Sequence, residues 1–398
     1  MSGRDLFSQP RRIGRGAALT LVFASVLATG AATGSFEEPY RRPATTDTSR
    51  SAPAGRERDV AEAAAEAMAD GESAVEAAER AVSRSGDRWG AVYSEDEYEQ
   101  FEEALDGAYT GVGLWARLER DGGIAVTRVQ DGSPAARAGI RAGDRLVGVD
   151  GEKVAGRPVT EVVSLLRGDA LDGDTGTTGA PESAAAGTKV SLELRRGTRT
   201  WHETLRRARL STEDVTLTRT AGGVGVITVD AFTKGSGDLV RAAVEQATEV
   251  SGFVLDLRGN SGGLVAEAVT ASSAFLDGGL VATYDVNGEQ QALHAEPGGD
   301  TTRALVALVD GGTMSAAELL TGALQDRGRA VVVGSRTFGK GSVQMPSRLP
   351  DGSVAELTVG HYRTPSGRGV DGTGITPDLE ADGDALRRAE TVLTGLGR

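Results

Sequence analysis

The stretch from Gly311 to Gln344 constrains the fold most, because it joins a sharp strand-to-helix turn to an isolated lysine. Val306–Val309 is a short apolar run typical of a strand, and two glycines break it. Apolar residues at helical spacing begin after Ser315, and Glu318 stands where a capping-box partner is expected. The pattern therefore predicts that Ser315 lies at a helix N-terminus, where backbone N–H groups and the helix dipole stabilise negative charge.

The lysine at the end of this stretch, Lys340, lies between two glycines and follows a second apolar run, Ala330–Val333. Among 43 lysine and arginine residues only four are lysines, namely Lys153, Lys189, Lys234 and Lys340. Lysine can lose its proton when it is desolvated, whereas arginine cannot. Gln344, four residues on, is expected on the same strand face, where its amide could orient a neutral amine. Such a set matches the nucleophile, base and orienting group of a serine triad. Taken singly, Ser315 is also compatible with a plain helix cap and Lys340 with an exposed turn.

The composition excludes several classes of site. The net charge, 43 − 57 = −14, argues against a nucleic-acid partner and against a basic membrane-binding patch. The chain has no cysteine, so disulfides, thiol catalysis and cysteine metal sites are impossible. Its three histidines (His202, His294 and His361) lack metal-ligand spacing, and no metal or cofactor is predicted.

Residues 1–36 have the layout of an export signal. Arg11, Arg12 and Arg15 precede an uncharged run of 21 residues, in which the most apolar part is followed by small residues. A run of this length is also enough for a retained membrane anchor, which needs about 20 residues. We therefore expect either a cleaved signal peptide or a single-pass anchor, and in both cases a location in the cell envelope or outside the cell.

Two segments without obvious chemistry follow. Residues 37–58 are rich in Pro, Arg, Thr, Ser and Gly and are predicted to be a disordered spacer. Residues 59–106 are predicted to be a helical arm, alanine-rich and charged at first, then with a helical stripe at Tyr98, Phe101 and Leu105. Its thin apolar face fits either a homodimerisation or docking arm, or a simple helical cover.

Residues 107–208 carry the string GSPAARAGIRAGDRLVGVDG (Gly132–Gly151), then a predicted helix, Thr160–Arg167, and a predicted strand, Lys189–Arg196. This order resembles a PDZ domain of the kind attached to bacterial proteases. Such a domain adds a peptide as an extra strand and holds its terminal carboxylate with backbone N–H groups. The resemblance implies that the substrate tail is bound by Tyr109, Thr110, Gly111, Val112 and Gly113, with an apolar pocket formed by Val162, Val163 and Leu166. An insertion at 169–188 is predicted to be a flexible loop.

Residues 209–398 alternate strand-like and helix-like runs, which predicts an α/β core. Val224–Val229 and Gly252–Leu257 are predicted buried strands separated by a helix at 238–250, and the string RGNSGG follows. With Ser315, Lys340 and a late YRTPSGR string, this order is similar to the carboxyl-terminal processing (tail-specific) peptidases, a family of PDZ-containing Ser-Lys serine proteases. The resemblance runs from about residue 109 to residue 379.

The resemblance implies an α+β multidomain chain with an N-terminal helical arm, a β-rich PDZ-like domain and an α/β peptidase core. It assigns Ser315 as nucleophile, Lys340 as general base and Gln344 as the residue that positions the lysine. The oxyanion hole maps to the backbone N–H groups of Ala316 and of Gly262 or Gly263, with Gly262 favoured. The implied activity is an exported endopeptidase that cleaves protein or peptide substrates with exposed apolar C-termini, without a cofactor.

Three alternative interpretations fit the sequence less well. The string around Ser261 also resembles the nucleophile turn of trypsin-like proteases, but that fold needs a preceding His and Asp in a double β-barrel, and only His202 precedes it. A catalytically silent PDZ-bearing scaffold is expected to have lost Ser315 or Lys340, and both are present. A signal-peptidase or β-lactamase type of Ser-Lys enzyme needs an S-x-x-K pattern, which is absent at Ser315.

Overall fold

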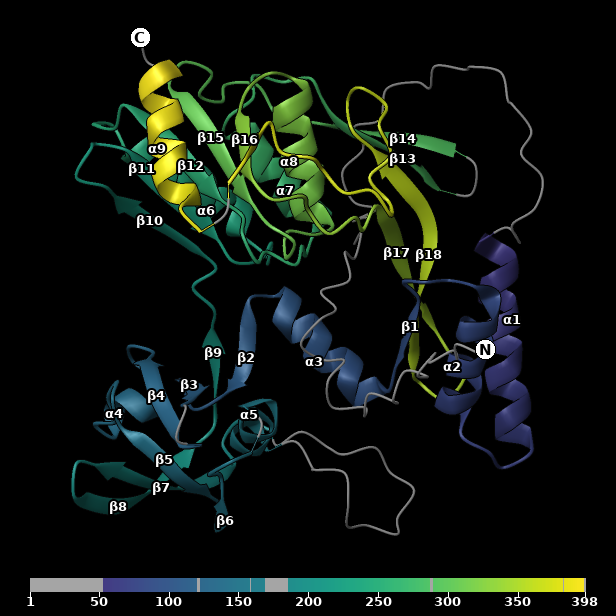
Figure 1. Cartoon of the computed structure of the whole chain (residues 1–398). Coiled ribbons are helices and arrows are strands. Elements are labelled where there is room, and N and C mark those ends of the chain that lie inside the picture. Colours follow the sequence, from purple (N-terminus) through teal and green to yellow (C-terminus); the bar gives the residue numbers. More distant parts are fainter. Residues whose placement is uncertain are drawn as a thin grey trace, which may run out of the picture. The chain divides into compact units, whose positions relative to one another are not determined.

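The computed structural model describes residues 53–119, 122–157, 159–168, 185–286, 289–381 and 383–396. The predicted export segment and most of the predicted spacer and insertion lie outside these ranges. The described chain divides into a small unit, Tyr109–Leu210, and a large unit made of residues 53–108 and 211–396 (Figure 1). Within the described residues, no helix has both the length and the apolar character needed to cross a membrane.

The small unit is built on one antiparallel sheet. Its strands, in order across the sheet, are β3 (Leu114–Leu118), β4 (Ile124–Val129), β5 (Arg145–Val149), β7 (Lys189–Arg196) and β8 (Arg199–Arg206), with β6 (Glu152–Lys153) beside β5. Helices α4 (Pro134–Arg137) and α5 (Val159–Arg167) complete it, and β2 (Ala108–Gly111) pairs with β9 (Ala208–Ser211) at the ends of the unit. The strand predicted at 189–196 has those bounds, and the predicted helix begins one residue earlier than expected.

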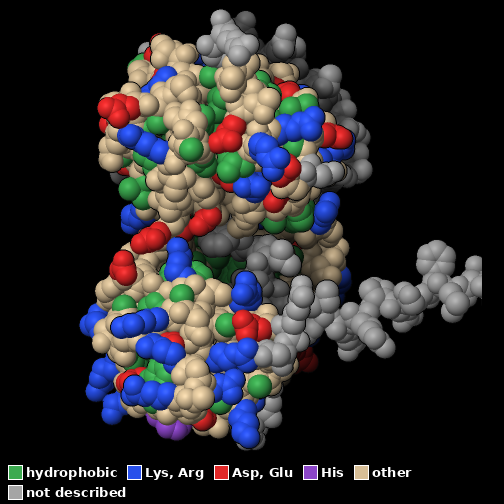
Figure 2. Space-filling view, turned by 60° about the vertical axis from the view of Figure 1, so that its left-hand side comes forward, with side chains coloured by type: hydrophobic (Ala, Val, Ile, Leu, Met, Phe, Trp, Pro, Cys, Tyr) green, Lys and Arg blue, Asp and Glu red, His purple; other side chains and the backbone are tan. Residues whose placement is uncertain are grey.

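The surface of the small unit is more basic than the net charge of the chain suggests. Figure 2 shows Lys and Arg side chains gathered on its exposed face. The exposed basic residues of this unit include Arg117, Arg128, Lys153, Lys189 and Arg206. The acidic excess of the chain therefore lies mainly in other segments.

The large unit contains a six-stranded sheet that is parallel except at one edge. Its order is β10 (Val215–Arg219), β11 (Gly225–Val229), β12 (Gly252–Asp256), β15 (Ala304–Val309), β16 (Val331–Gly334) and β19 (Leu379–Glu380), with β10 antiparallel. The predicted strands and the α/β pattern are thus present, with bounds shifted by at most two residues.

Helices cover both faces of this sheet, which explains the nearly continuous apolar strands. Helices α6 (Ser236–Gln246), α7 (Val265–Ser273) and α8 (Ala316–Asp326) share one core with Phe253, Leu255 and Ala307. Helix α9 (Ala385–Leu396) packs on the opposite face against Val254, Val306 and Leu308. Successive side chains of β12 and β15 therefore pack alternately into the core on one face of the sheet and the core on the other.

A second sheet in the large unit joins the N-terminal segment to the C-terminal one. It contains β1 (Ala91–Tyr93), β18 (Val354–Arg363), β13 (Leu280–Val286) and β14 (Glu289–His294), and β17 (Ser342–Arg348) also pairs with β18. Strand β1 was not predicted, because three residues are too short to show an alternating pattern.

The predicted helical arm contains α1 (Pro53–Ala69), α2 (Ala74–Ser85) and α3 (Glu95–Leu105). Helix α1 begins six residues before the predicted arm, so the prediction of a disordered spacer was wrong for residues 53–58. The apolar faces of α1 and α2, including Val60, Ala64 and Ala78, are buried against Ala355 and Leu357 of β18. The stripe on α3 packs against Val354 of the same strand. The thin apolar face thus has its partner within the chain, as expected for a helical cover.

This packing predicts that Ala64→Glu will destabilise the large unit, because it buries an unpaired charge against β18. The expected loss is at least about 2 kcal/mol of unfolding free energy, measured by urea titration. Ala65→Glu is the matched control, since Ala65 is exposed on the same helix and its change should cost less than about 0.5 kcal/mol. Equal losses in the two variants would show that α1 is not docked as described.

Candidate active site

Ser315 lies at the turn between β15 and α8, as the sequence predicts, and it is fully buried. Its φ of 57° and ψ of −119° are unusual, and only one other described non-glycine residue has a positive φ. Such a conformation costs on the order of 1–3 kcal/mol and persists where the surroundings hold it. Here the turn is fixed by Thr313, whose hydroxyl donates to Leu257, and by Met314, whose N–H donates to Asn260.

The carboxylate of Glu318 joins the turn at Ser315 to the loop that carries Lys340. One oxygen accepts the backbone N–H groups of Ser315 (2.9 Å) and Lys340 (2.8 Å). The other accepts the N–H of Gly339 (2.7 Å) and the hydroxyl of Thr337 (2.5 Å). The sequence predicted only the bond to Ser315. Burial raises the pKa of Glu318, while these four hydrogen bonds favour the charged form and oppose the rise.

Tyr362 contacts the same two segments through their backbone carbonyl groups. Its buried hydroxyl lies 2.9 Å from the carbonyl oxygen of Ser315 and 3.2 Å from that of Lys340, and it can donate to either. Glu318 and Tyr362 together therefore fix both the N–H and the C=O groups around the serine and the lysine.

Lys340 is buried and precedes β17 rather than lying on it. The sequence suggested that Lys340 and Gln344 share a strand face. This prediction was wrong, because Lys340 lies outside the strand. Its flanking glycines are required sterically. A Cβ on Gly341 would lie 2.4 Å from the backbone nitrogen of Asp371, and one on Gly339 would lie 3.0 Å from that of Gly374. Close packing against the 371–374 loop thus explains the Gly-Lys-Gly pattern.

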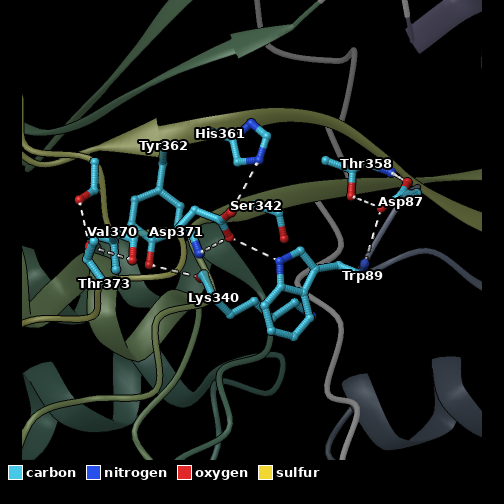
Figure 3. A network of polar contacts seen from close by, with 12 residues as sticks. Asp87, Trp89, Lys340, Ser342, Thr358, His361, Tyr362, Val370, Asp371 and Thr373 are labelled. Carbon is cyan, nitrogen blue, oxygen red and sulfur yellow. Dashed lines mark hydrogen bonds and ion pairs between the residues drawn. The ribbon is translucent and has the colours of Figure 1, made fainter. Parts of the chain in front are cut away.

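Trp89, from the segment between α2 and β1, lies next to Lys340 (Figure 3). The lysine Nζ is 5.6 Å from the centroid of the indole ring, and the indole N–H donates to Asp371 (3.0 Å). Burial lowers the pKa of Lys340 to about 8, although the negative charges of Glu356, Asp87 and Glu318 act in the opposite direction. A substantial share of the amine is consequently neutral at mildly alkaline pH.

Gln344 is fully buried on β17, and its amide nitrogen donates to the hydroxyls of Ser342 (2.7 Å) and Thr358 (3.3 Å). Its amide oxygen has no hydrogen-bond partner among the residues that the structure describes. Lys340 and Gln344 are thus not hydrogen-bonded to each other in this structure. The amide oxygen is thus a buried acceptor without a donor in the described part of the chain.

Glu356, opposite Ala91 on β18, is a fully buried carboxyl that the sequence did not single out. Neither of its oxygens has a hydrogen bond of normal geometry within the described residues, although Tyr98 is close enough to lower its pKa. Burial dominates and raises the pKa of Glu356 to about 7, while the positive charge of Lys340 acts against the rise.

The two glycines proposed for the oxyanion hole differ in their hydrogen bonds. The N–H of Gly262 donates to the side chain of Asn260 (2.8 Å), whereas the N–H of Gly263 has no such partner within the described residues. Gly262 packs directly on Ser315, since a Cβ there would lie 2.9 Å from the Cβ of Ser315 and 3.3 Å from the nitrogen of Ala316. Glycine is therefore required at 262 for packing.

The remaining predicted residues lie elsewhere. Ser261 follows β12 in an α/β core, not in a β-barrel, and His202 is exposed on β8 of the small unit. In the small unit Val112, Val162 and Leu166 are buried in the core, whereas Val163 is half-buried. The hydroxyl of Tyr109 donates to Gln130 (2.8 Å). Most of the pocket predicted on α5 thus belongs to the core of this unit.

The Glu318 contacts predict that Glu318→Gln will weaken the site severely. An amide replaces one acceptor oxygen with a donor that faces two other donors, which should cost at least about 2 kcal/mol of unfolding free energy. Glu267→Gln is a suitable control, because Glu267 is only half-buried and accepts just the N–H groups of Gly235 and Gly237. If urea unfolding gave the same loss for both, the central role of Glu318 would be wrong.

Glu356 gives a pH-dependent prediction. Its pKa is raised from 4.5 to about 7 in the folded state, so the folded chain binds the proton more tightly than the unfolded chain. Its contribution to the unfolding free energy is present below pH 4.5 and is lost as pH rises through about 7. The loss amounts to about 3 kcal/mol.

Glu356→Gln should therefore gain stability relative to the unmutated chain as pH rises from 4.5 to 8, measured by urea unfolding at each pH. Glu99→Gln, at an exposed position on α3, should show no such trend. A constant difference between Glu356→Gln and the unmutated chain across this range would contradict the raised pKa.

Comparisons with known proteins agree with this architecture. The model of peptidase family S41 matches residues 223–381, and a PDZ-domain model matches residues 125–170. The carboxy-terminal processing protease CtpA of Bacillus subtilis (strain 168) is 32% identical over 301 residues, which cover 74% of this chain and 61% of that protein. The chloroplastic carboxyl-terminal-processing peptidase 3 of Arabidopsis thaliana is 33% identical over 315 residues, which cover 74% and 58%. The chain thus spans about three fifths of the length of these curated relatives.

Solved structures give the same result. The photosystem II D1 C-terminal processing protease is 26% identical with a TM-score of 0.50, over 86% of this chain and 98% of that one. A putative S41 protease from Bacteroides fragilis, 18% identical with a TM-score of 0.51 over 78% of this chain and 87% of that one, has a similar fold. The predicted α+β fold class, with a PDZ domain and a tail-specific protease core, is confirmed. The chain therefore contains a core that matches peptidase family S41, together with a PDZ domain.

Proposed function

We propose that this protein is a serine endopeptidase that cleaves protein substrates near their C-termini, with Ser315 as the nucleophile. The observation that carries the proposal is the strained, buried turn at Ser315, which opens a helix and shares the Glu318 carboxylate with Lys340. Strain of this kind concentrates at functional sites. The match to peptidase family S41 supports the proposal, as do the names of the relatives, which are carboxyl-terminal processing proteases.

In the proposed reaction, the neutral amine of Lys340 takes the proton from Ser315 Oγ as that oxygen attacks the scissile carbonyl. The lysine then gives the proton to the leaving amine, and water releases the acyl group by the same route. With a pKa of about 8, roughly a tenth of the lysine is neutral at pH 7. The unpartnered amide oxygen of Gln344 supports its role as the acceptor that orients this amine.

The negative oxygen of the tetrahedral intermediate is proposed to accept hydrogen bonds from the backbone N–H groups of Ala316 and Gly263. Ala316 is the first residue of α8, so the helix dipole adds to its N–H. The bond from Gly262 to Asn260 favours Gly263 as the second donor. Each such donor typically lowers the barrier by about 3 kcal/mol.

The PDZ domain is proposed to bind the free C-terminus of the substrate as an added strand, at the loop from Tyr109 to Gly113. The basic surface of this domain favours a negatively charged tail end. The predicted export signal or anchor leads us to propose further that the enzyme acts in the cell envelope or outside the cell.

Cleavage of an unstructured protein with an apolar tail by the full-length chain tests this proposal. Ser315→Ala and Lys340→Arg should each lower the rate at least about 1,000-fold, the second because arginine keeps its proton. Ser261→Ala should cleave like the unmutated chain. A substrate amidated at its C-terminus should be cut more slowly than the free acid.

Retention of activity in Ser315→Ala, or its loss in Ser261→Ala, would refute the assignment of the nucleophile. Equal cleavage of the amidated and free-acid substrates would refute tail recognition. If the unmutated chain cleaves no substrate, the proposed peptidase activity is wrong, and a catalytically silent PDZ-bearing scaffold is the better interpretation.

A further inference from the structure

A buried hydrogen-bond chain leads from Asp87, in the N-terminal segment, to Gln344. Asp87 lies between α2 and β1, and its side chain is 2% exposed. Its carboxylate accepts both the backbone N–H and the hydroxyl of Thr358 on β18, each at 2.7 Å (Figure 3). Arg56 closes the arrangement with an ion pair to Asp87 (3.6 Å) and a bond to the carbonyl of Thr358 (3.0 Å). Asp87 and Thr358 are 271 positions apart in the sequence.

The direction of each bond in this chain is determined by the chemistry of Asp87. Its carboxylate also accepts the N–H groups of Trp89 (3.2 Å) and Gly90 (3.0 Å), so donors surround it and it acts purely as an acceptor. The hydroxyl of Thr358 has one proton, and that proton must point to Asp87. The same hydroxyl can therefore offer only lone pairs to Gln344, 3.3 Å away.

This direction fixes which end of the Gln344 amide is the nitrogen. The NH2 group must face Thr358 and Ser342, because both hydroxyls lie within hydrogen-bond distance of it. The amide oxygen must then point the other way, where it is buried without a partner in the described part of the chain. Rotating the amide would place its oxygen next to the Thr358 hydroxyl oxygen. That hydroxyl already donates its proton to Asp87, so two acceptors would then face each other.

A neutral lysine has one lone pair and two N–H groups. As a base it must turn the lone pair to the serine hydroxyl. A neighbouring acceptor favours this orientation, because it binds one of the two N–H groups, whereas a neighbouring donor would compete with the serine for the lone pair. We propose that Asp87 and Thr358 are positioning residues, which hold the Gln344 amide oxygen, rather than its NH2 group, in place to receive an N–H of Lys340. This inference rests on the proposed function of Lys340 as base.

Other charges around the lysine bear on the test. Glu356 on β18, Asp87 and Glu318 on α8 all raise the pKa of Lys340. Replacing Asp87 would change both a charge and the amide orientation. Thr358 carries no charge, so changing it isolates the orientation effect.

The first experiment measures kcat and KM of the full-length chain as a function of pH for Thr358→Val and Thr358→Ser. Valine keeps the shape of threonine without the hydroxyl, which frees the amide of Gln344 to turn. Thr358→Val should lower the plateau of kcat roughly tenfold, the equivalent of one hydrogen bond, with KM within about twofold. The acid limb of its kcat profile should move to lower pH, since a turned NH2 group repels the charged lysine.

Thr358→Ser keeps the hydroxyl, so its plateau value of kcat and the pH of its acid limb should equal those of the unmutated chain. Thr218→Val, on the exposed face of the edge strand β10, controls for a general effect of the substitution. Two outcomes would overturn the inference: Thr358→Val with unchanged kcat and limb, or Thr358→Ser as impaired as Thr358→Val. The second would show that packing, not the hydroxyl, matters.

A measurement without turnover separates this inference from the proposed function. In 15N–1H NMR spectra of the full-length chain, the Gln344 side-chain NH2 protons, identified by their loss in Gln344→Leu, should exchange slowly with water. Thr358→Val should speed this exchange at least about tenfold, while Thr358→Ser should not. Fast exchange in the unmutated chain would overturn the chain of bonds even if Ser315 proves to be the nucleophile. Slow exchange in a chain that cleaves nothing would leave the bond network in place and refute the catalytic assignment.

Discussion

The buried carboxylate of Glu318 is the interaction on which the candidate site depends. It accepts three backbone N–H groups and one hydroxyl, from the helix that begins after Ser315 and from the loop that carries Lys340. Without it, these donors would be buried and unpaired, and the bond from the Phe338 N–H to the Thr313 carbonyl would have to hold the two segments. Tyr362 complements it on the carbonyl side. The strained φ of Ser315 is thus held by contacts that also place the lysine backbone.

The N-terminal segment is part of this site as well as a cover for it. Helices α1 and α2 bury the apolar side of β18, and β1 adds a strand to the same sheet. Between α2 and β1 the chain brings Asp87 to Thr358 and Trp89 to Lys340. Burial by such neighbours is what lowers the pKa of the lysine, so the same segment contributes to the fold and to the proposed chemistry.

Local patterns predicted the parts of the structure that depend on neighbouring residues. Apolar runs located the strands around Ser315, and the scarcity of lysine drew attention to Lys340. Contacts between distant segments leave no such pattern, so the meeting of Asp87 with Thr358 could not be predicted. Glu356 occupies a polar position in an alternating strand, which normally indicates solvent exposure, but α3 covers that face. The proposal of Gly263 rather than Gly262 as the second oxyanion donor likewise rests on the position of the Asn260 side chain.

The central claim is that Ser315 is a nucleophile activated by Lys340. The most direct measurement is the rate at which a fluorophosphonate modifies the full-length chain, followed across pH, with the modified residue identified by peptide mass spectrometry. We expect a single adduct on Ser315, formed at a rate that rises through a pKa of about 8 and falls to background in Lys340→Arg. An adduct on Ser261, or a rate that Lys340→Arg leaves unchanged, would contradict the account.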